Sequence, residues 1–316
     1  MKHLVETQAL THKYGNTIAL ESLDLSIPSG AVYGFIGPNG AGKTTTMRIL
    51  TTLLAPSTGQ AWVAGHAVTR EPRAVRRVVG FMPDFFGVYD NMRAWEYLDF
   101  FAAAYNVPAN RRPTMINELL ELVDLSHKRD AYVMGLSRGM KQRLSLARTM
   151  VHDPALLILD EPASGLDPRA RVELRELLKE LRTLNKTIMI SSHILTELAE
   201  MCTHIGIIER GRLLASGDVA SIMRSLQAHH VFEVHILNDL EAAAALVRDV
   251  PGVLDVRVLP EALPPMLHID YEGDGQSVSD LLARLVAGGA AVTHFASQVN
   301  DLEDIFLKVT DQAVLI

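Results

Sequence analysis

Cysteine, excess basic charge and long apolar runs are all missing or scarce in this chain of 316 residues. The single cysteine, Cys202, excludes an intramolecular disulfide framework and suits a reducing compartment. Lys and Arg total 30 against 37 Asp and Glu, a net charge of −7, which argues against a nucleic-acid binder. No apolar run approaches the roughly 18 residues of a membrane-spanning helix, and residues 1–14 lack the continuous hydrophobic segment of a signal peptide. We therefore expect a soluble intracellular protein, to which another chain supplies any membrane part.

Short β-rich segments alternate with longer helical patterns, which predicts an α/β architecture with a largely parallel sheet. Residues 31–36 and 156–159 are clear strand candidates, and Arg210-Gly211 is placed to turn a hairpin. Because 316 residues are long for one domain, we expect a boundary within the chain. The pattern restarts near residues 225–230, so we predict two domains, 1–227 and 228–316.

The second predicted domain has the element order β-α-β-β-α-β, which is typical of a ferredoxin-like α+β unit. Its expected elements are strand 231–237, helix 239–248, strands 253–259 and 266–271, helix 278–286, strand 291–296 and a last helix at 299–309. About 85 residues are enough for a small hydrophobic core of its own.

The segment GPNGAGKT, which begins at Gly37, fits the phosphate-loop pattern G-x-x-x-x-G-K-[ST] completely. It lies between a strand candidate and a helical pattern, so backbone N–H groups and a helix N-terminus converge on one anion. Lys43 can reach the β- and γ-phosphates, and the Thr44 hydroxyl can ligate Mg²⁺. A glycine-rich turn with a surface lysine is the alternative. The predicted nucleotide contacts are Gly37, Pro38, Asn39, Gly40, Ala41, Gly42, Lys43, Thr44 and Thr45.

Two acidic residues, Asp160 and Glu161, follow the buried strand candidate at 156–159. A carboxylate at such a strand end is the second half of a nucleotide hydrolase, because it holds the metal ion that the phosphates need. We predict that Asp160 holds magnesium through water and that Glu161 polarises the attacking water as a catalytic residue. Ordinary polar residues at a strand end are the alternative.

Between these motifs, residues 136–142 read LSRGMKQ, similar to the signature Leu-Ser-Gly-Gly-Gln of one family. With the motifs in this order, residues 4–226 resemble the ATP-binding subunit of an ATP-binding cassette (ABC) transporter. Ser137 is a good helix N-cap, and apolar residues follow it at helical spacing. The resemblance implies that Ser137 and Gly139 face the γ-phosphate bound to the opposite subunit. A plain amphipathic helix with basic residues on its solvent face is the alternative.

Three more positions match the family one by one. Tyr14 looks like the aromatic residue that stacks on adenine, although a lone tyrosine is more often a surface or core residue. Asp167, in SGLD, resembles the loop that communicates between the two ATP sites, and it can also cap the helix that starts at Pro168. His193 matches the histidine that contacts the γ-phosphate and is predicted to be catalytic with Lys43. A polar residue at a strand end is the alternative for His193.

Three positions depart from the family pattern. Asp84 stands where the family has a glutamine that reaches the magnesium and the attacking water. We predict that Asp84 contacts the metal directly or through water, while a position outside the site is the alternative. Arg138 and Met140 replace signature glycine and glutamine. Arg138 is placed to pair with phosphate, with a carboxylate across the dimer, or to lie in solvent, and both changes put the rate of hydrolysis in doubt.

The resemblance implies a P-loop ATPase of the ABC type, in which antiparallel β and helical subdomains flank a mixed-sheet core. It implies binding of ATP and Mg²⁺, and a head-to-tail homodimer around two ATP molecules. Integral membrane permease subunits are the expected partners, export is favoured over import, and the expected location is the cytoplasmic face of the cell membrane. A soluble ABC-type ATPase acting on ribosomes or DNA is the alternative. The single phosphate loop, the acidic charge and the lack of sustained heptads argue against it, so no nucleic acid is expected.

The resemblance also assigns two segments outside the ATP site. One is a permease-binding groove just after Asp84, where Phe85, Phe86 and Tyr89 are expected. Three neighbouring residues are expected in the subdomain core instead, namely Trp95, Leu98 and Phe101. The other segment, residues 301–307, resembles the C-terminal extension of drug and lipid exporter ATPases. For the C-terminal unit, dimer support or regulation is favoured over ligand binding.

Overall fold

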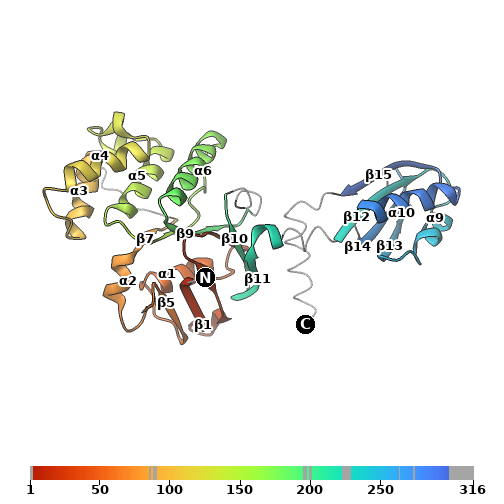
Figure 1. The fold of residues 1–316 in the computed structure, drawn as a ribbon, viewed down its shortest axis with the longest axis horizontal. Helices are drawn as coiled ribbons and strands as arrows, with labels where there is room; N and C mark the ends of the chain where they lie inside the picture. The colour runs from red at the N-terminus through yellow and green to blue at the C-terminus, as the bar shows by residue number, and fades with distance from the viewer. Residues whose placement is uncertain are drawn as a thin grey trace. The chain divides into compact units, whose positions relative to one another are not determined.

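The structure is a computed structural model that describes residues 3–84, 87, 91–194, 198, 201–222, 229–262, 264–272 and 275–298. The helix expected at 299–309, the extension at 301–307, and Phe85, Phe86 and Tyr89 lie outside these residues. The chain divides into two compact units, Met1–Val219 and Ala220–Ile316 (Figure 1). The boundary expected after residue 227 falls within 223–228, which the structure does not describe. In the described part, no helix has the length and apolarity to cross a membrane.

The centre of the first unit is a six-stranded sheet with the order β11-β10-β4-β9-β8-β7. All neighbours are parallel except β10 and β11, which form the antiparallel hairpin predicted at Arg210-Gly211. Both hairpin residues have positive φ, 47° and 81°. The central strands β4, β9 and β8 are buried along their whole length because both faces are covered. Their bounds are β4 Val32–Ile36, β7 Val79–Met82, β8 Leu156–Leu159, β9 Thr187–Ser192, β10 His204–Glu209 and β11 Arg212–Asp218.

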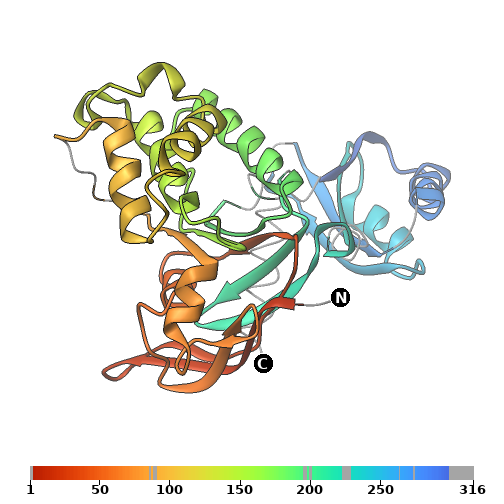
Figure 2. The same ribbon diagram turned by 60° about the vertical axis from the view of Figure 1, so that its left-hand side comes forward.

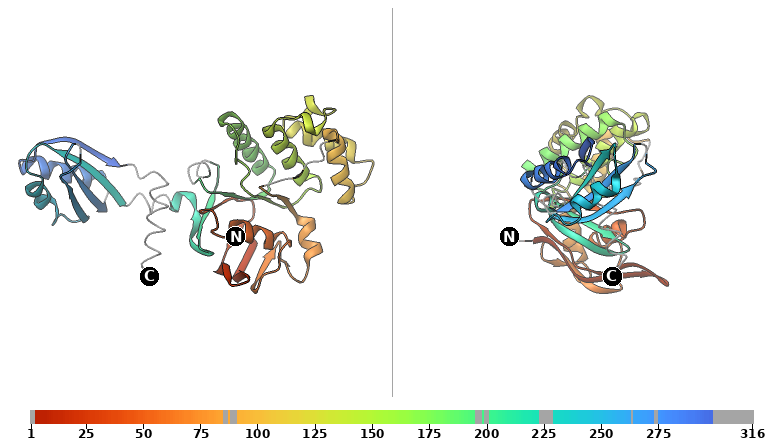
Figure 3. Two further views of the ribbon diagram at one scale, coloured as in Figure 1. Left: turned by 180° about the vertical axis from the view of Figure 1, so that it is seen from behind. Right: turned by 90° about the vertical axis from the view of Figure 1, so that its right-hand side faces the viewer.

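A second, antiparallel sheet lies on one side of this central sheet, and helices α3, α4, α5 and α6 lie on its other side (Figures 1 and 3). Its order is β2-β1-β5-β6, with β3 also paired to β1. Helix α1 shares a buried core with both sheets, through Ile49 and Leu50 against Val5, Val63 and Ile158. The strands are β1 His3–Tyr14, β2 Thr17–Leu23, β3 Ser26–Pro28, β5 Thr58–Val63 and β6 His66–Ala67.

Helices α3, α4 and α5 gather into a helical subdomain beside α6 (Figure 2). Leu98 is fully buried there, as predicted, and Trp95 is half-buried under the guanidinium of Arg129. The prediction for Phe101 is wrong in part, because its ring lines a surface groove and lies 5.2 Å from the Arg148 guanidinium. The first-unit helices are α1 Lys43–Leu50, α2 Pro72–Val78, α3 Ala94–Ala104, α4 Arg112–Leu122, α5 Arg138–Met150 and α6 Pro168–Thr183, with 3₁₀ turns at Ser126–Lys128 and Val133–Gly135.

The second unit is a four-stranded antiparallel sheet of order β13-β14-β12-β15, packed against two helices. The first and third strands in the chain are central and the second and fourth are at the edges, which is the ferredoxin-like arrangement predicted from the element order. The buried face consists of alternate residues such as Phe232, Val234 and Ile236. Its elements are β12 His229–Ile236, α9 Leu240–Val247, β13 Val253–Leu259, β14 Met266–Glu272, α10 Gly275–Ala287 and β15 Val292–Gln298.

Neighbouring residues of α10 give a direct test of this second core. Leu285 is fully buried against the sheet, whereas Val286 beside it is 58% exposed. We expect Leu285→Ala to lower the free energy of unfolding of the unit by about 2–5 kcal/mol, since it leaves a cavity. Val286→Ala should change it by less than about 0.5 kcal/mol. Hydrogen exchange of the β12 and β14 amides, followed by mass spectrometry, checks this difference. Equal effects of the two substitutions would contradict the described packing.

Candidate active site

The loop between β4 and α1 forms a backbone cradle at the carboxyl edge of the central sheet. Gly40 and Gly42 have φ of 83° and 109°, a region that favours glycine. A Cβ on Gly37 would lie 2.2 Å from the carbonyl oxygen of Ile208, so no larger residue fits there. Residues 38–40 are exposed at the rim, and helix α1 starts at Lys43. All nine predicted loop and helix-start residues therefore lie along one curved stretch whose N–H groups can bind phosphate.

The Lys43 ammonium lies at the centre of this cradle and is 6% exposed. Its Nζ donates to the carbonyl oxygens of Gly37, at 2.6 Å, and Pro38, at 3.3 Å. It also lies 3.4 Å from Oε1 of Glu161. A lysine on a flexible stem can turn from these carbonyls to a phosphate without any change in the backbone. Thr44 follows it, half-buried in the first turn of α1.

Asp160 and Glu161 follow the end of β8 near Lys43. Ser191, on the neighbouring strand β9, forms hydrogen bonds with both residues. Asp160 is 2% exposed, and the Ser191 hydroxyl donates to its Oδ1 at 2.6 Å. The same hydroxyl oxygen accepts from the backbone N–H of Glu161 at 2.8 Å. Ser191 is thus a site residue that the sequence analysis missed. Its only signal was its place at the end of the apolar strand β9.

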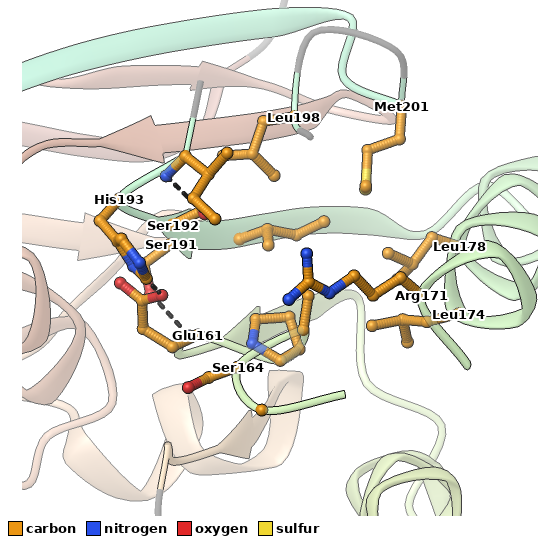
Figure 4. Close-up of a pocket in the computed structure, with 15 residues that line it drawn as sticks. Glu161, Ser164, Arg171, Leu174, Leu178, Ser191, Ser192, His193, Leu198 and Met201 are labelled. Atoms are coloured by element: carbon orange, nitrogen blue, oxygen red, sulfur yellow. Dashed lines mark hydrogen bonds and ion pairs between the residues drawn. The ribbon is translucent and has the colours of Figure 1, made fainter. Parts of the chain in front are cut away.

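The Glu161 carboxylate is held between two nitrogen groups. Its Oε2 is 3.0 Å from Nδ1 of His193, and the two side chains point toward each other in Figure 4. Its Oε1 is buried and accepts no hydrogen bond among the described residues, although Lys43 is near. The residue has φ of 48°, a conformation that costs about 1–3 kcal/mol outside glycine. This strained backbone directs the Glu161 side chain toward Lys43 of the phosphate loop. Its Oε1 can therefore accept a further hydrogen bond there.

Asp84, just after β7, lies near the same carboxylates. Burial raises the pKa of Asp84 above its usual value, the charges of Asp160 and Glu161 raise it further, and Arg138 opposes them. A divalent cation would relieve this repulsion, so the donor set fits Mg²⁺. In the described part of the chain, no three His, Cys, Asp or Glu side chains form a metal site by themselves. Mg²⁺ in proteins is usually held by one or two carboxylates together with substrate phosphates and water.

A cavity of about 200 Å³ adjoins the Glu161 side of the site. Figure 4 shows Glu161 and His193 at one end and an apolar wall at the other, with Arg171 between them. The wall is formed by Leu174, Leu178, Leu198 and Met201. This cavity therefore lies behind the Glu161 carboxylate, and no residue of the phosphate loop is among its described lining residues.

Comparison with known proteins agrees with this geometry. A family model described as ABC transporter matches residues 20–164. The bacitracin transport ATP-binding protein BcrA of Bacillus licheniformis is 34% identical over 98% of this chain and 98% of its own length. This chain belongs to the ABC transporter ATP-binding subunits. The daunorubicin/doxorubicin resistance ATP-binding protein DrrA of Streptomyces peucetius is 33% identical, over 97% of this chain and 92% of its own. Nod factor export ATP-binding protein I of Cupriavidus metallidurans is 32% identical, over 98% of each chain.

The fold of this chain also resembles solved structures of the family. An ATP-binding subunit of an ABC transporter matches with a TM-score of 0.64 and 29% identity. The match covers 71% of this chain and 93% of the other. This chain is accordingly an ATP-hydrolysing subunit of an ABC transporter, as predicted. The soluble ATPase acting on ribosomes or DNA is not favoured, because these relatives are named for transport or drug resistance.

The ABC signature begins helix α5 as the sequence predicted. Ser137 has extended backbone angles, and its Oγ accepts from the N–H of Met140 at 3.3 Å, which makes it the N-cap. Gly139 lies in the first turn, and a Cβ there would be 3.5 Å from Cβ of Ala170 on α6. Arg138 is exposed, and its Nη2 donates to the carbonyl oxygen of Ser164 at 3.1 Å.

Two other predicted residues lie at element ends. Asp167 caps helix α6, since its Oδ1 accepts from the N–H of Ala170 at 3.0 Å, and Pro168 follows at the first helical position. The capping role is confirmed, and the role in communication between ATP sites stays a prediction. Tyr14 ends β1 with its ring 47% exposed and edge-on to His12 at 4.6 Å. An exposed ring of this kind is free to stack on a base.

Proposed function

We propose that two copies of this chain bind two ATP molecules head to tail and power an exporter whose permease is a separate membrane protein. The observation that carries the proposal is the junction of Lys43, Glu161 and His193 beside the phosphate loop. The relatives named for Nod factor export and for drug resistance support export over import. The proposed location is the cytoplasmic face of the cell membrane, where the permease would hold the chain.

In this proposal Lys43 binds the β- and γ-phosphate oxygens and neutralises charge that grows as the γ-phosphoryl group leaves. Glu161 accepts a hydrogen bond from the attacking water and orients it in line with the phosphoryl group. His193 contacts the γ-phosphate and holds Glu161 through the 3.0 Å contact between them. Thr44, Asp84 and Asp160 would hold Mg²⁺, which supplies positive charge between the phosphates when bound.

The opposite subunit would complete each site. Ser137 and Gly139 are at the N-terminus of α5, a helix of 13 residues whose unpaired N–H groups and partial positive charge favour an anion. We assign that anion to the γ-phosphate of the partner's ATP. Tyr14 would stack on the adenine ring of the chain's own nucleotide. Loss of the γ-phosphate bridge would loosen the dimer and move the permease.

A groove on the first unit is the proposed permease contact. It has a volume of about 450 Å³ and lies beside β7, between α1 and α3. Three of its lining residues are arginines, and among the described lining residues none carries a carboxylate. Of these arginines, Arg148 donates to the Phe81 carbonyl oxygen and Arg76 donates to Thr52. The Arg48 side chain has neither an ion pair nor a hydrogen bond among the described residues. Aromatic rings of Phe101 and Tyr105 lie among them, so a short amphipathic segment with at least one carboxylate fits.

Reversing one charge in the groove tests this contact and the proposed function together. We expect Arg48→Glu to reduce recovery with the integral membrane protein that co-purifies with the wild type by about tenfold, since like charges oppose docking. ATP hydrolysis by the isolated chain should stay unchanged. Arg169→Glu is the matched control, because Arg169 is 89% exposed and, within the described part of the chain, forms an ion pair with Glu173 alone, one turn along α6. Undiminished recovery of Arg48→Glu would remove the groove from the proposal. Recovery of the wild type with ribosomes or DNA in place of a membrane protein would refute transport.

The second unit is proposed to support the dimer or to regulate the ATPase, in preference to binding a ligand. The relatives cited above match along nearly the whole chain, so they match across this unit as well. Removal of the residues from 228 onward should weaken ATP-driven dimers or uncouple hydrolysis from transport. Unchanged dimerisation and transport would dismiss both roles.

A further inference from the structure

Arg138 connects the signature helix to the segment that carries the catalytic carboxylate of the same chain. Its Nη2 donates to the carbonyl oxygen of Ser164 at 3.1 Å. Ser164 in turn donates its backbone N–H to the carbonyl oxygen of Glu161 at 3.0 Å. Two hydrogen bonds therefore lead from the start of α5 to Glu161, although the two residues are 23 positions apart in the chain.

The Arg138 guanidinium lies against the backbone at Gly165. Gly165 has φ of 66°, which favours glycine, and a Cβ there would lie 2.3–2.5 Å from three atoms of the guanidinium. A larger residue at this position would displace the guanidinium, which is the end of a flexible side chain. Arg138 also lies near enough to Asp84 to stabilise the carboxylate of that residue. The side chain thus faces several parts of its own subunit's hydrolysis site.

A second contact joins the same helix to the same segment. Gln142, one turn after Arg138, is 5% exposed, and its Nε2 donates to the carbonyl oxygen of Pro162. The first two turns of α5 are therefore fixed to residues 162–164 at two points. A shift of the helix start must either move this segment or break both hydrogen bonds.

We infer that Arg138 is a positioning residue that couples the two ATP sites of the dimer. The inference rests on the head-to-tail dimer proposed above. In that dimer Ser137 and Gly139 face the partner's nucleotide, while Glu161 acts on the chain's own nucleotide. Binding of the partner's γ-phosphate holds the start of α5 in place. Because Arg138 is hydrogen-bonded to Ser164, and Ser164 to Glu161, the position of the Glu161 backbone is then fixed as well. A glycine at position 138, as in the usual signature, would have no side chain to make this connection.

Cooperativity between the two sites is the property to measure, because a purely structural role would not change it. We expect a Hill coefficient for ATP hydrolysis of about 1.5–2 in the wild type, near the limit set by two sites. Arg138→Ala should lower it to about 1 and slow maximal hydrolysis by about fivefold, within the usual range of coupling between sites. Arg138→Lys keeps a cationic donor and should restore most of the cooperativity. Arg169→Ala, on the neighbouring helix, is the control and should match the wild type.

The affinity for a single nucleotide, measured with the same variants at low protein concentration, should not change. A Hill coefficient near 1 in the wild type would overturn the inference, and so would an unchanged coefficient in Arg138→Ala. ATP-dependent dimerisation of Glu161→Gln separates the inference from the proposed function. If that variant stays monomeric in ATP, the head-to-tail dimer fails and the coupling fails with it. If it dimerises and Arg138→Ala keeps full cooperativity, only the coupling role fails.

Discussion

Replacing Glu161 with glutamine should slow ATP hydrolysis by about 10³-fold, within the range for loss of a general base. The amide keeps the shape of the side chain, but it carries no negative charge and accepts a proton poorly. The nearest carboxylate in the sequence, Asp160, is less suited to this role because its Oδ1 already accepts from the Ser191 hydroxyl. ATP should still bind, since Lys43 and the phosphate loop are unchanged.

Release of inorganic phosphate under saturating ATP measures this effect. Glu180→Gln is a suitable control, because it removes an exposed carboxylate from α6 far along the helix from the site. The control should hydrolyse ATP at the wild-type rate. Hydrolysis by Glu161→Gln within tenfold of the wild type would show that another group orients the water.

Lys43→Ala should remove both binding and turnover. Its ammonium is the buried cation of the cradle, and the adjacent carboxylate of Glu161 would then repel the phosphates without opposition. We expect ATP affinity to fall about 100-fold, about 2.7 kcal/mol, and turnover to fall by at least about 10³-fold. Equilibrium binding of a fluorescent ATP analogue and phosphate release measure the two effects separately.

Lys179→Ala is the matched control for Lys43→Ala, since Lys179 is half-exposed on α6 and its one ion pair with a described residue is with Glu176. Both variants should show circular dichroism spectra like that of the wild type. Wild-type nucleotide affinity in a folded Lys43→Ala variant would place the phosphates elsewhere. A loss of binding in the Lys179 variant would instead indicate a general effect of removing charge.

Local patterns in the sequence predicted the parts of the site that depend on neighbouring residues. The phosphate loop, the carboxylates after β8 and the cap at Ser137 each follow from a strand, turn or helix start in a short segment. The hairpin at Arg210-Gly211 and the ferredoxin-like order were predicted for the same reason. These features are set by periodicity, glycine and capping groups, which a single sequence displays.

Contacts between distant segments could not be predicted in this way. Ser191 reaches Asp160 across neighbouring strands that are separated by about 30 residues, and a serine at a strand end has many possible partners. For the Arg138 side chain the sequence left a phosphate, a carboxylate across the dimer and solvent as alternatives. Its partner in the structure is a backbone carbonyl oxygen, and since every residue has one, the sequence gives no sign of which it will be. Phe101 was expected in the core, but helical spacing does not tell which side of a subdomain remains uncovered.

Mixing two inactive variants tests most directly whether two copies share each ATP site. Lys43→Ala removes ATP binding by the phosphate loop of its own subunit. Ser137→Arg blocks the signature helix start that would contact the γ-phosphate of the partner's ATP. In a head-to-tail dimer of one variant with the other, one site keeps an intact loop and an intact signature. The mixture should therefore recover at most about a quarter of wild-type hydrolysis, the value for independent sites, since half of the dimers are mixed and each has one complete site of two. Coupling between the two sites through Arg138 would lower this fraction further, by about fivefold. Activity no greater than that of the separate variants would contradict an ATPase built from two facing copies.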